Sequence, residues 1–78
     1  MRSVIDQYVI NQVRDRRKKM KVSQEKLAYA IGFESKGYIG KIESKNPKYD
    51  DTYNISHLNV IAKILECSPK DFMPEKAL

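Results

Sequence analysis

The chain has 78 residues and a formal net charge of +5, with one cysteine and one histidine. The single cysteine excludes a disulfide within the chain, and no group of residues has the spacing of metal ligands, so we expect neither a metal nor another cofactor. The absence of an apolar run of about 20 residues excludes a membrane-spanning helix, so we expect a cytoplasmic protein without a membrane partner.

The positive charge is concentrated in the first part of the chain. Residues 1–45 carry eleven Lys or Arg against five acidic residues, whereas residues 46–78 carry four against five. This asymmetry favours a polyanionic partner on one face, although a solvated surface of mixed charge is the alternative. A chain of this length suits one small domain, which we place over residues 1–78 with its core at about 5–73.

The first predicted helix runs from about Ser3, its N-cap, to about Lys19. Its last turn, residues 16–19, is entirely basic, and positive charge there suits the negative end of the helix dipole. That structural role competes with contact to phosphate for the same side chains. The apolar residues at helical intervals, which we expect to face the core, are Ile5, Val9, Val13 and Met20.

Two short helices are predicted next. Ser23 is the N-cap of the first, and Gly32 lies where a helix often stops in a left-handed conformation. Ser35 is the N-cap candidate of the second, which covers about nine residues and ends before Pro47. The apolar residues expected on their inner faces are Leu27, Ala28, Ile31, Ile39 and Ile42.

A fourth helix is predicted after Asn54, its N-cap, with an apolar stripe that fits the spacing i, i+3, i+4, i+7. Ser68 followed by a proline then opens a short closing turn that brings Phe72 to the core. No stretch alternates apolar and polar residues for long enough to predict a strand. The sequence therefore predicts an all-α fold with five helices and no internal repeat.

Residues 23–43 read SQEKLAYAIGFESKGYIGKIE and place two short helices around a tight turn, with a helix-turn-helix at about 24–43. This stretch resembles the helix-turn-helix of the XRE, or lambda-repressor-like, transcription regulators. Their pattern is roughly S/T-Q-E-x-L-A, a glycine, a turn, and then S-x-x-x-I-S-x-I/W-E. The likeness extends over about residues 10–73, and it implies a five-helix lambda-repressor-like DNA-binding domain.

The resemblance also implies a role for each polar residue. Ser23 and Gln24 match positions at the sugar–phosphate backbone, and the residues after the third helix match a loop that contacts phosphate. Lysines at the groove-facing positions can donate to guanine, and a tyrosine there can reach a phosphate. Arg17 and Glu43 match an ion pair, to which we assign a structural role. The implied DNA-binding residues are Ser23, Gln24, Ser35, Lys36, Gly37, Tyr38, Lys41, Ser44, Lys45 and Asn46.

The sequence departs from the family pattern in three places. The turn between Gly32 and Ser35 is one residue longer than usual, and the loop at 47–53 is also longer. Gly37 and Gly40 stand where polar side chains are frequent. They indicate either a close approach of the backbone to DNA or tight packing against the first helix, and both alternatives stay open.

We therefore expect a small transcriptional regulator, acting as a repressor, that binds double-stranded DNA as a homodimer on a two-fold site. An enzyme is excluded because no catalytic set can be assembled from these residues. One alternative is the antitoxin of a toxin–antitoxin pair, which binds a protein partner as well as its operator. A module that binds only proteins is a third possibility.

Overall fold

Short polar caps decide where the helices of this chain begin. The computed structural model describes residues 2–32 and 37–78. The first helix, α1 (Val4–Lys19), begins after Ser3, whose hydroxyl accepts a hydrogen bond from a backbone N–H of the first turn. The predicted N-cap and the predicted end of this helix are both confirmed.

The second helix, α2 (Gln24–Ala30), also begins and ends where the sequence predicts. The hydroxyl of Ser23 accepts from the N–H of Lys26 at 3.0 Å, so the expected N-cap is confirmed. Gly32 lies just beyond the C-terminal end with φ of +88°, and its N–H donates to the carbonyl of Tyr29 at 3.1 Å. A residue with a Cβ is strained in this left-handed region, so glycine is required by the backbone there.

The third helix, α3 (Gly37–Glu43), has seven residues and buries Ile39 and Ile42 completely. The expected N-cap, Ser35, lies outside the described residues. A helix of this length is unstable in isolation. The conformational entropy lost when its first turn forms exceeds the stabilisation from two turns of hydrogen bonds. Its stability therefore comes from packing on its neighbours.

The last two elements are held by capping boxes. Asn54 caps α4 (Ile55–Ile64), and the ring of His57 accepts a hydrogen bond from the Asn54 N–H at 3.3 Å. The final element, η1 (Pro69–Phe72), is a single 3-10 turn opened by a similar box. The element predicted as the fifth helix is therefore only this 3-10 turn. Its four residues are too few for a series of α-helical hydrogen bonds.

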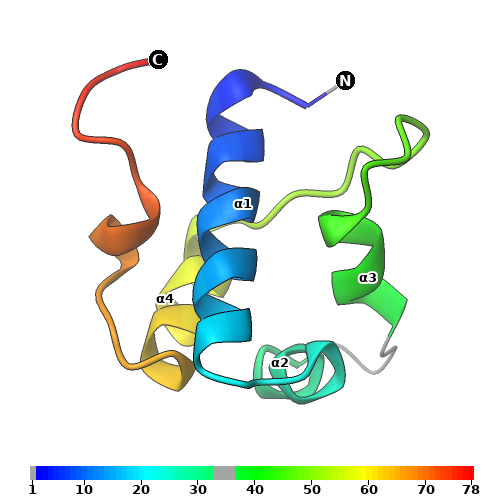
Figure 1. Ribbon diagram of the computed structural model, residues 1–78, viewed down its shortest axis with the longest axis vertical. Helices are drawn as coiled ribbons and strands as arrows, with labels where there is room; N and C mark the ends of the chain where they lie inside the picture. The colour runs from blue at the N-terminus through cyan, green and yellow to red at the C-terminus, as the bar shows by residue number, and fades with distance from the viewer. Residues whose placement is uncertain (1, 33–36) are drawn as a thin grey trace.

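α1 runs through the middle of the view and crosses in front of α4 (Figure 1). α2 packs against both α3 and α4, while α1 packs against α3 and η1. The start of α1 and the C-terminal segment lie towards the same end of the molecule (Figure 1). The described residues form a compact all-helical domain without strands, and none of its helices is long and apolar enough to cross a membrane.

Every helix contributes to one core. Phe72 carries the closing turn into it, and the half-buried Cys67 packs at its edge, where burial raises the pKa of the thiol. The other residues of this core are Val9, Ile10, Val13, Leu27, Ala28, Ile39, Ile42, Tyr53, Leu58, Ile61, Ala62 and Leu65.

The inner face of α1 differs from the expected one at both ends. Ile5 is 44% exposed, since the first turn of α1 extends past the core, and Met20 is 37% exposed at the C-terminal cap. Arg17 is buried instead, four residues after Val13 on the same face. The buried face of α1 therefore includes a charged residue, Arg17, in its last turn.

Candidate nucleic-acid interface

α3 has two chemically different faces. Ile39 and Ile42 are fully buried against the other helices, whereas Gly37 and the side chain of Lys41 are exposed. Lys45 is also exposed and follows Lys41 by four residues, just beyond the end of the helix. The outer side of this short helix therefore presents positive charge next to glycine, where the backbone itself is open to a ligand.

Tyr38 divides between these two faces. The resemblance placed it at a groove-facing position, but its ring is partly buried and packs against the core. Only part of this side chain is therefore open to a partner. Tyrosine suits such a position, since its ring can pack while its hydroxyl end stays available for polar contacts.

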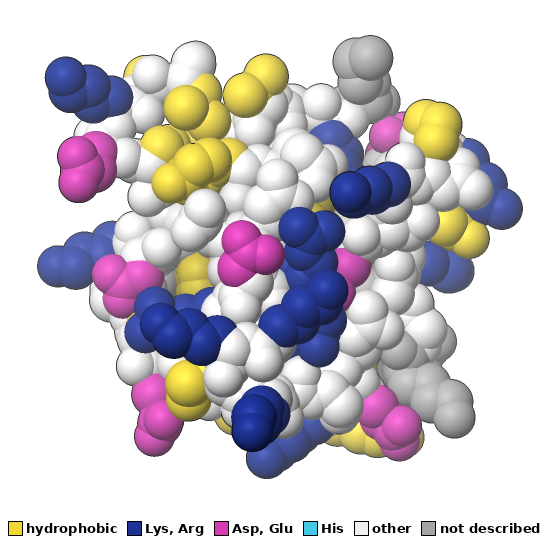
Figure 2. Space-filling view, viewed as in Figure 1, with side chains coloured by type: hydrophobic (Ala, Val, Ile, Leu, Met, Phe, Trp, Pro, Cys, Tyr) yellow, Lys and Arg dark blue, Asp and Glu magenta, His cyan; other side chains and the backbone are white. Residues whose placement is uncertain are grey.

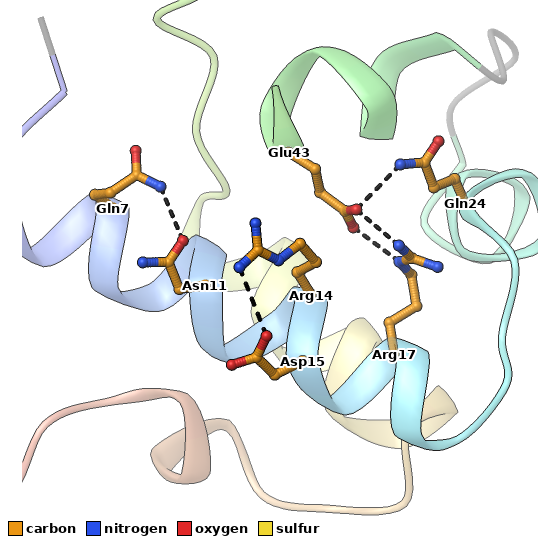
Figure 3. Close-up of polar contacts among 7 residues, drawn as sticks. All are labelled: Gln7, Asn11, Arg14, Asp15, Arg17, Gln24 and Glu43. Atoms are coloured by element: carbon orange, nitrogen blue, oxygen red, sulfur yellow. Dashed lines mark hydrogen bonds and ion pairs between the residues drawn. The ribbon is translucent and has the colours of Figure 1, made fainter. Parts of the chain in front are cut away.

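The position of α3 is fixed by an ion pair with α1 (Figure 3). Arg17 donates through Nε and Nη2 to the two carboxylate oxygens of Glu43, at 2.8 and 2.7 Å, and through Nη1 to the carbonyl of Val22 at 2.9 Å. The two side chains are only 9% and 5% exposed. These hydrogen bonds raise the pKa of Arg17 against the opposing effect of burial. The pair expected to be structural is thus a buried, bidentate contact.

Gln24 joins the same cluster from α2 (Figure 3). Its amide nitrogen donates to Oε1 of Glu43 at 3.0 Å, so the carboxylate links three helices. A contact between Gln24 and DNA would have to use its remaining N–H or its side-chain oxygen. A Cβ at Gly40 would lie 3.5 Å from the Gln24 side-chain oxygen, an ordinary contact, with nothing from α1 nearer. Packing against the first helix is therefore not what requires glycine at position 40.

Tyr53 is buried beside this cluster, and its hydroxyl has no hydrogen-bond partner within the described part of the chain. Burial raises the pKa of this hydroxyl above its ordinary value, and the nearby Glu43 carboxylate raises it further. The phenol therefore stays neutral at physiological pH. The Tyr53 side chain fills space where the helices pack together and adds no charge there.

The loop that follows α3 is organised by its own side chains. The hydroxyl of Ser44 accepts from the N–H of Asn46, and Oδ1 of Asn46 accepts from the N–H of Lys48, both at 3.1 Å. The Tyr49 N–H donates to the Asn46 carbonyl at 3.1 Å and closes the turn. The Asn46 side-chain amide keeps its donors for another partner, and Lys45 is exposed between the two acceptors.

No family model matches the chain. A search of curated proteins and a search of solved structures also return no significant match.

The basic residues of α1 have different roles. Arg16 donates to the carbonyl of Leu65 at 3.4 Å and so caps the end of α4, while Arg14 lies 3.7 Å from the carboxylate of Asp15. Lys18 and Lys19 are exposed. Lys and Arg side chains gather over the C-terminal half of α1 (dark blue in Figure 2). This part of the surface attracts polyanions without a fixed geometry.

Two of the expected DNA-binding residues, Ser35 and Lys36, lie outside the described residues. Ser23 is exposed at the start of α2, where its hydroxyl serves as the cap. Within residues 2–32 and 37–78, no three His, Cys, Asp or Glu side chains are grouped as metal ligands would be.

Sequence reasoning missed Arg2, which the fold places beside the end of α3 and the loop that follows it. Its guanidinium donates to backbone carbonyls at the end of α3 and in the following loop. No motif marks such a residue, because its acceptors are main-chain atoms 39 to 49 positions away.

Proposed function

We propose that this protein binds double-stranded DNA of a particular sequence through a helix-turn-helix formed by α2 and α3. The observation that carries the proposal is that α3 buries Ile39 and Ile42 completely while Lys41 on the helix and Lys45 just after it are exposed. In a helix-turn-helix the second helix enters the major groove while the first lies across the backbone. The tight packing of α2 against α3 supports that arrangement.

Under this proposal the exposed residues divide into two groups. Lys41 and Lys36 donate to guanine in the major groove, with Tyr38 at its edge and Gly37 allowing the backbone to approach. Contacts from Lys45 and Asn46 to phosphates set the register of the domain on the duplex. Ser23, Gln24, Ser35 and Ser44 complete the set of candidate DNA contacts. Arg17 and Glu43 hold the helices in position without touching DNA.

The proposed mechanism is occupancy of an operator. A homodimer of this 31 × 30 × 21 Å domain can place two copies of α3 in successive major grooves, about one helical turn apart, on a two-fold site. Binding there would exclude the polymerase, which makes repression the expected outcome. The protein would then act as a small transcriptional regulator.

Selection of bound duplexes from a random pool tests this proposal directly. We expect an enriched sequence with two-fold symmetry, with G at a position read by a lysine of α3. Recovery of sequences without enrichment would show non-specific attraction alone. A complete failure to retain any duplex at low salt would contradict DNA binding.

Substitutions on α3 and α2 are expected to have different effects on sequence preference. Lys41→Ala should relax discrimination at one base position, because a base contact contributes about 1–3 kcal/mol at that position only. Gln24→Ala should weaken binding to all sequences more evenly, and it also removes the hydrogen bond to Glu43. The measurement is the affinity of each variant for the selected duplex and for its single-base mutants.

The control for this comparison is Lys63→Ala, which removes an exposed charge from the last turn of α4. That variant should keep the full base preference. If Gln24→Ala relaxed one position and Lys41→Ala weakened all sequences equally, the roles given to the two helices would be exchanged.

A second candidate function is that of an antitoxin, which binds a protein partner as well as its operator. It is favoured by exposed apolar side chains, which gather over the start of α1 and the C-terminal segment (yellow in Figure 2). The large apolar residues exposed in these two segments are Val4 (71%), Ile5 (44%), Met73 (38%) and Leu78 (64%). Exposed apolar groups of this kind mark surfaces that bind other proteins.

Ile5→Asp tests this second candidate. If a protein partner binds there, the variant should lose a second protein that co-purifies at fixed stoichiometry, while its affinity for duplex DNA stays within about twofold. Ile55→Asp is the matched control, since Ile55 is 78% exposed on α4. Loss of a homodimer together with loss of operator affinity would instead assign this surface to self-association.

A further inference from the structure

Arg2 connects the start of the chain to the end of α3. Its guanidinium donates to the backbone carbonyls of Lys41 at 3.2 Å, Ser44 at 3.3 Å and Asp51 at 3.1 Å. A fourth contact, at 3.4 Å, reaches the side-chain oxygen of Gln7. One side chain thus joins the segment before α1, the last turn of α3 and the far end of the loop that follows it.

The chemistry of this contact explains why an arginine is needed. The last carbonyls of a helix have no partner within the helix and lie at the negative end of its dipole. A guanidinium carries five N–H donors in a rigid, charged fork, so it can satisfy several carbonyls at once, whereas a lysine acts as a point charge. Arg2 therefore serves as a C-terminal cap for α3 that is supplied from a distant part of the chain.

The loop after α3 is largely exposed and borders a groove. An open groove of about 990 Å³ separates the start of α1 from residues 44–50. Pro47, Lys48 and Asp50 are exposed, so this part of the loop has little packing. The hydrogen bonds of Arg2 span the two sides of the groove at one end. Without them, the loop backbone would have many more conformations available.

The residues held in this way carry proposed DNA contacts, to a base for Lys41 and to phosphates for Lys45 and Asn46. The carbonyl of Lys41 is bound by Arg2 while its side chain is exposed, and Lys45 and Asn46 lie between the bound carbonyls of Ser44 and Asp51. A loop that is already ordered before binding loses less entropy when it meets the DNA. Arg2 can thus influence affinity without touching the duplex.

We propose that Arg2 is a positioning residue for DNA binding, which fixes the end of α3 and the loop at 44–51 so that their contacts to the duplex form together. This inference rests on the proposed function. The guanidinium acts through the three backbone carbonyls. Its geometry, rather than its charge, is the property that matters.

The test compares the wild type with Arg2→Lys and Arg2→Ala on the duplex selected above, at a temperature where circular dichroism shows all three proteins folded. We expect both variants to lose about tenfold in affinity for every sequence. The negative slope of log K against log salt should become shallower by about 1 in both. Arg2→Lys is the decisive variant, because it keeps the charge but cannot make the fork of contacts. Lys63→Ala, the charge control, should retain wild-type affinity.

Amide hydrogen exchange of residues 45–51 provides a readout that does not involve DNA. Exchange there should accelerate in both Arg2 variants of the free protein, while exchange in α4 stays unchanged. Wild-type affinity in Arg2→Lys, or unchanged exchange in the loop, would overturn the positioning role. If the wild type binds no duplex at all, the proposed function fails and this inference fails with it, whereas binding by the wild type and both variants alike overturns the inference only.

Discussion

Replacing Glu43 with alanine is expected to lower the free energy of unfolding by about 3–5 kcal/mol. The side chain of Arg17 is only 9% exposed, and the substitution removes the carboxylate that pairs with its guanidinium. The substitution also removes the acceptor of the Gln24 amide. A domain of this length has about 4–12 kcal/mol of stability in total, so the variant should lose a large part of its stability. Urea denaturation followed by circular dichroism measures the effect.

Two further variants make this result specific. Glu75→Ala removes an exposed carboxylate and should change stability by less than about 0.5 kcal/mol. The double variant Arg17→Met/Glu43→Leu should recover most of the loss, because an apolar pair of similar volume avoids the burial of an unpaired charge. A Glu43→Ala protein with wild-type stability and no affinity for DNA would mean that this carboxylate belongs to the binding surface instead of the scaffold.

Duplex binding is expected to weaken by about 10³-fold for each half of the dimer when the salt concentration rises from 50 to 200 mM. Contact with about six phosphates gives each half of the dimer a slope of about −5 for log K against log salt, because each neutralised phosphate releases a condensed counterion. The cationic outer face of α3 and the exposed Lys45 motivate this expectation. Fluorescence anisotropy with a labelled duplex measures the affinity across the salt series.

The slope should also report which lysines contact phosphate. Lys45→Ala is expected to make it shallower by about 1, while Lys63→Ala, a control on α4, leaves it unchanged. Binding that ignores salt would contradict a cationic DNA-binding face. An equal change for both variants would indicate general attraction by net charge without a defined contact at Lys45.

The features of the fold that could be predicted from the sequence are those that depend on neighbouring residues. Each N-cap hydroxyl or amide bonds a backbone N–H two or three residues ahead, so Ser3, Ser23, Asn54 and Ser68 mark helix starts without knowledge of the fold. The capping box that His57 completes with Asn54 is not predicted. The usual signature has Glu or Gln at that position, so a histidine there gave no signal.

Features that depend on distant parts of the chain could not be predicted in this way. Ile5 follows the apolar spacing of α1 but lies beyond the reach of the core, and only the length of the packed elements decides that. In the candidate site, the contact between Arg17 and Glu43 was expected only through a family resemblance. The hydrogen bonds of Arg2 leave no trace in the sequence, since any residue can supply a backbone carbonyl.

The backbone at Gly32 sets the direction in which the chain leaves α2. A turn of this handedness accepts glycine readily, asparagine with some cost and branched side chains poorly. A substitution at position 32 would therefore strain the end of α2 and the angle at which the chain leaves it. Distant homologues that keep this angle should carry glycine or asparagine at the equivalent position, even where the surrounding letters have diverged.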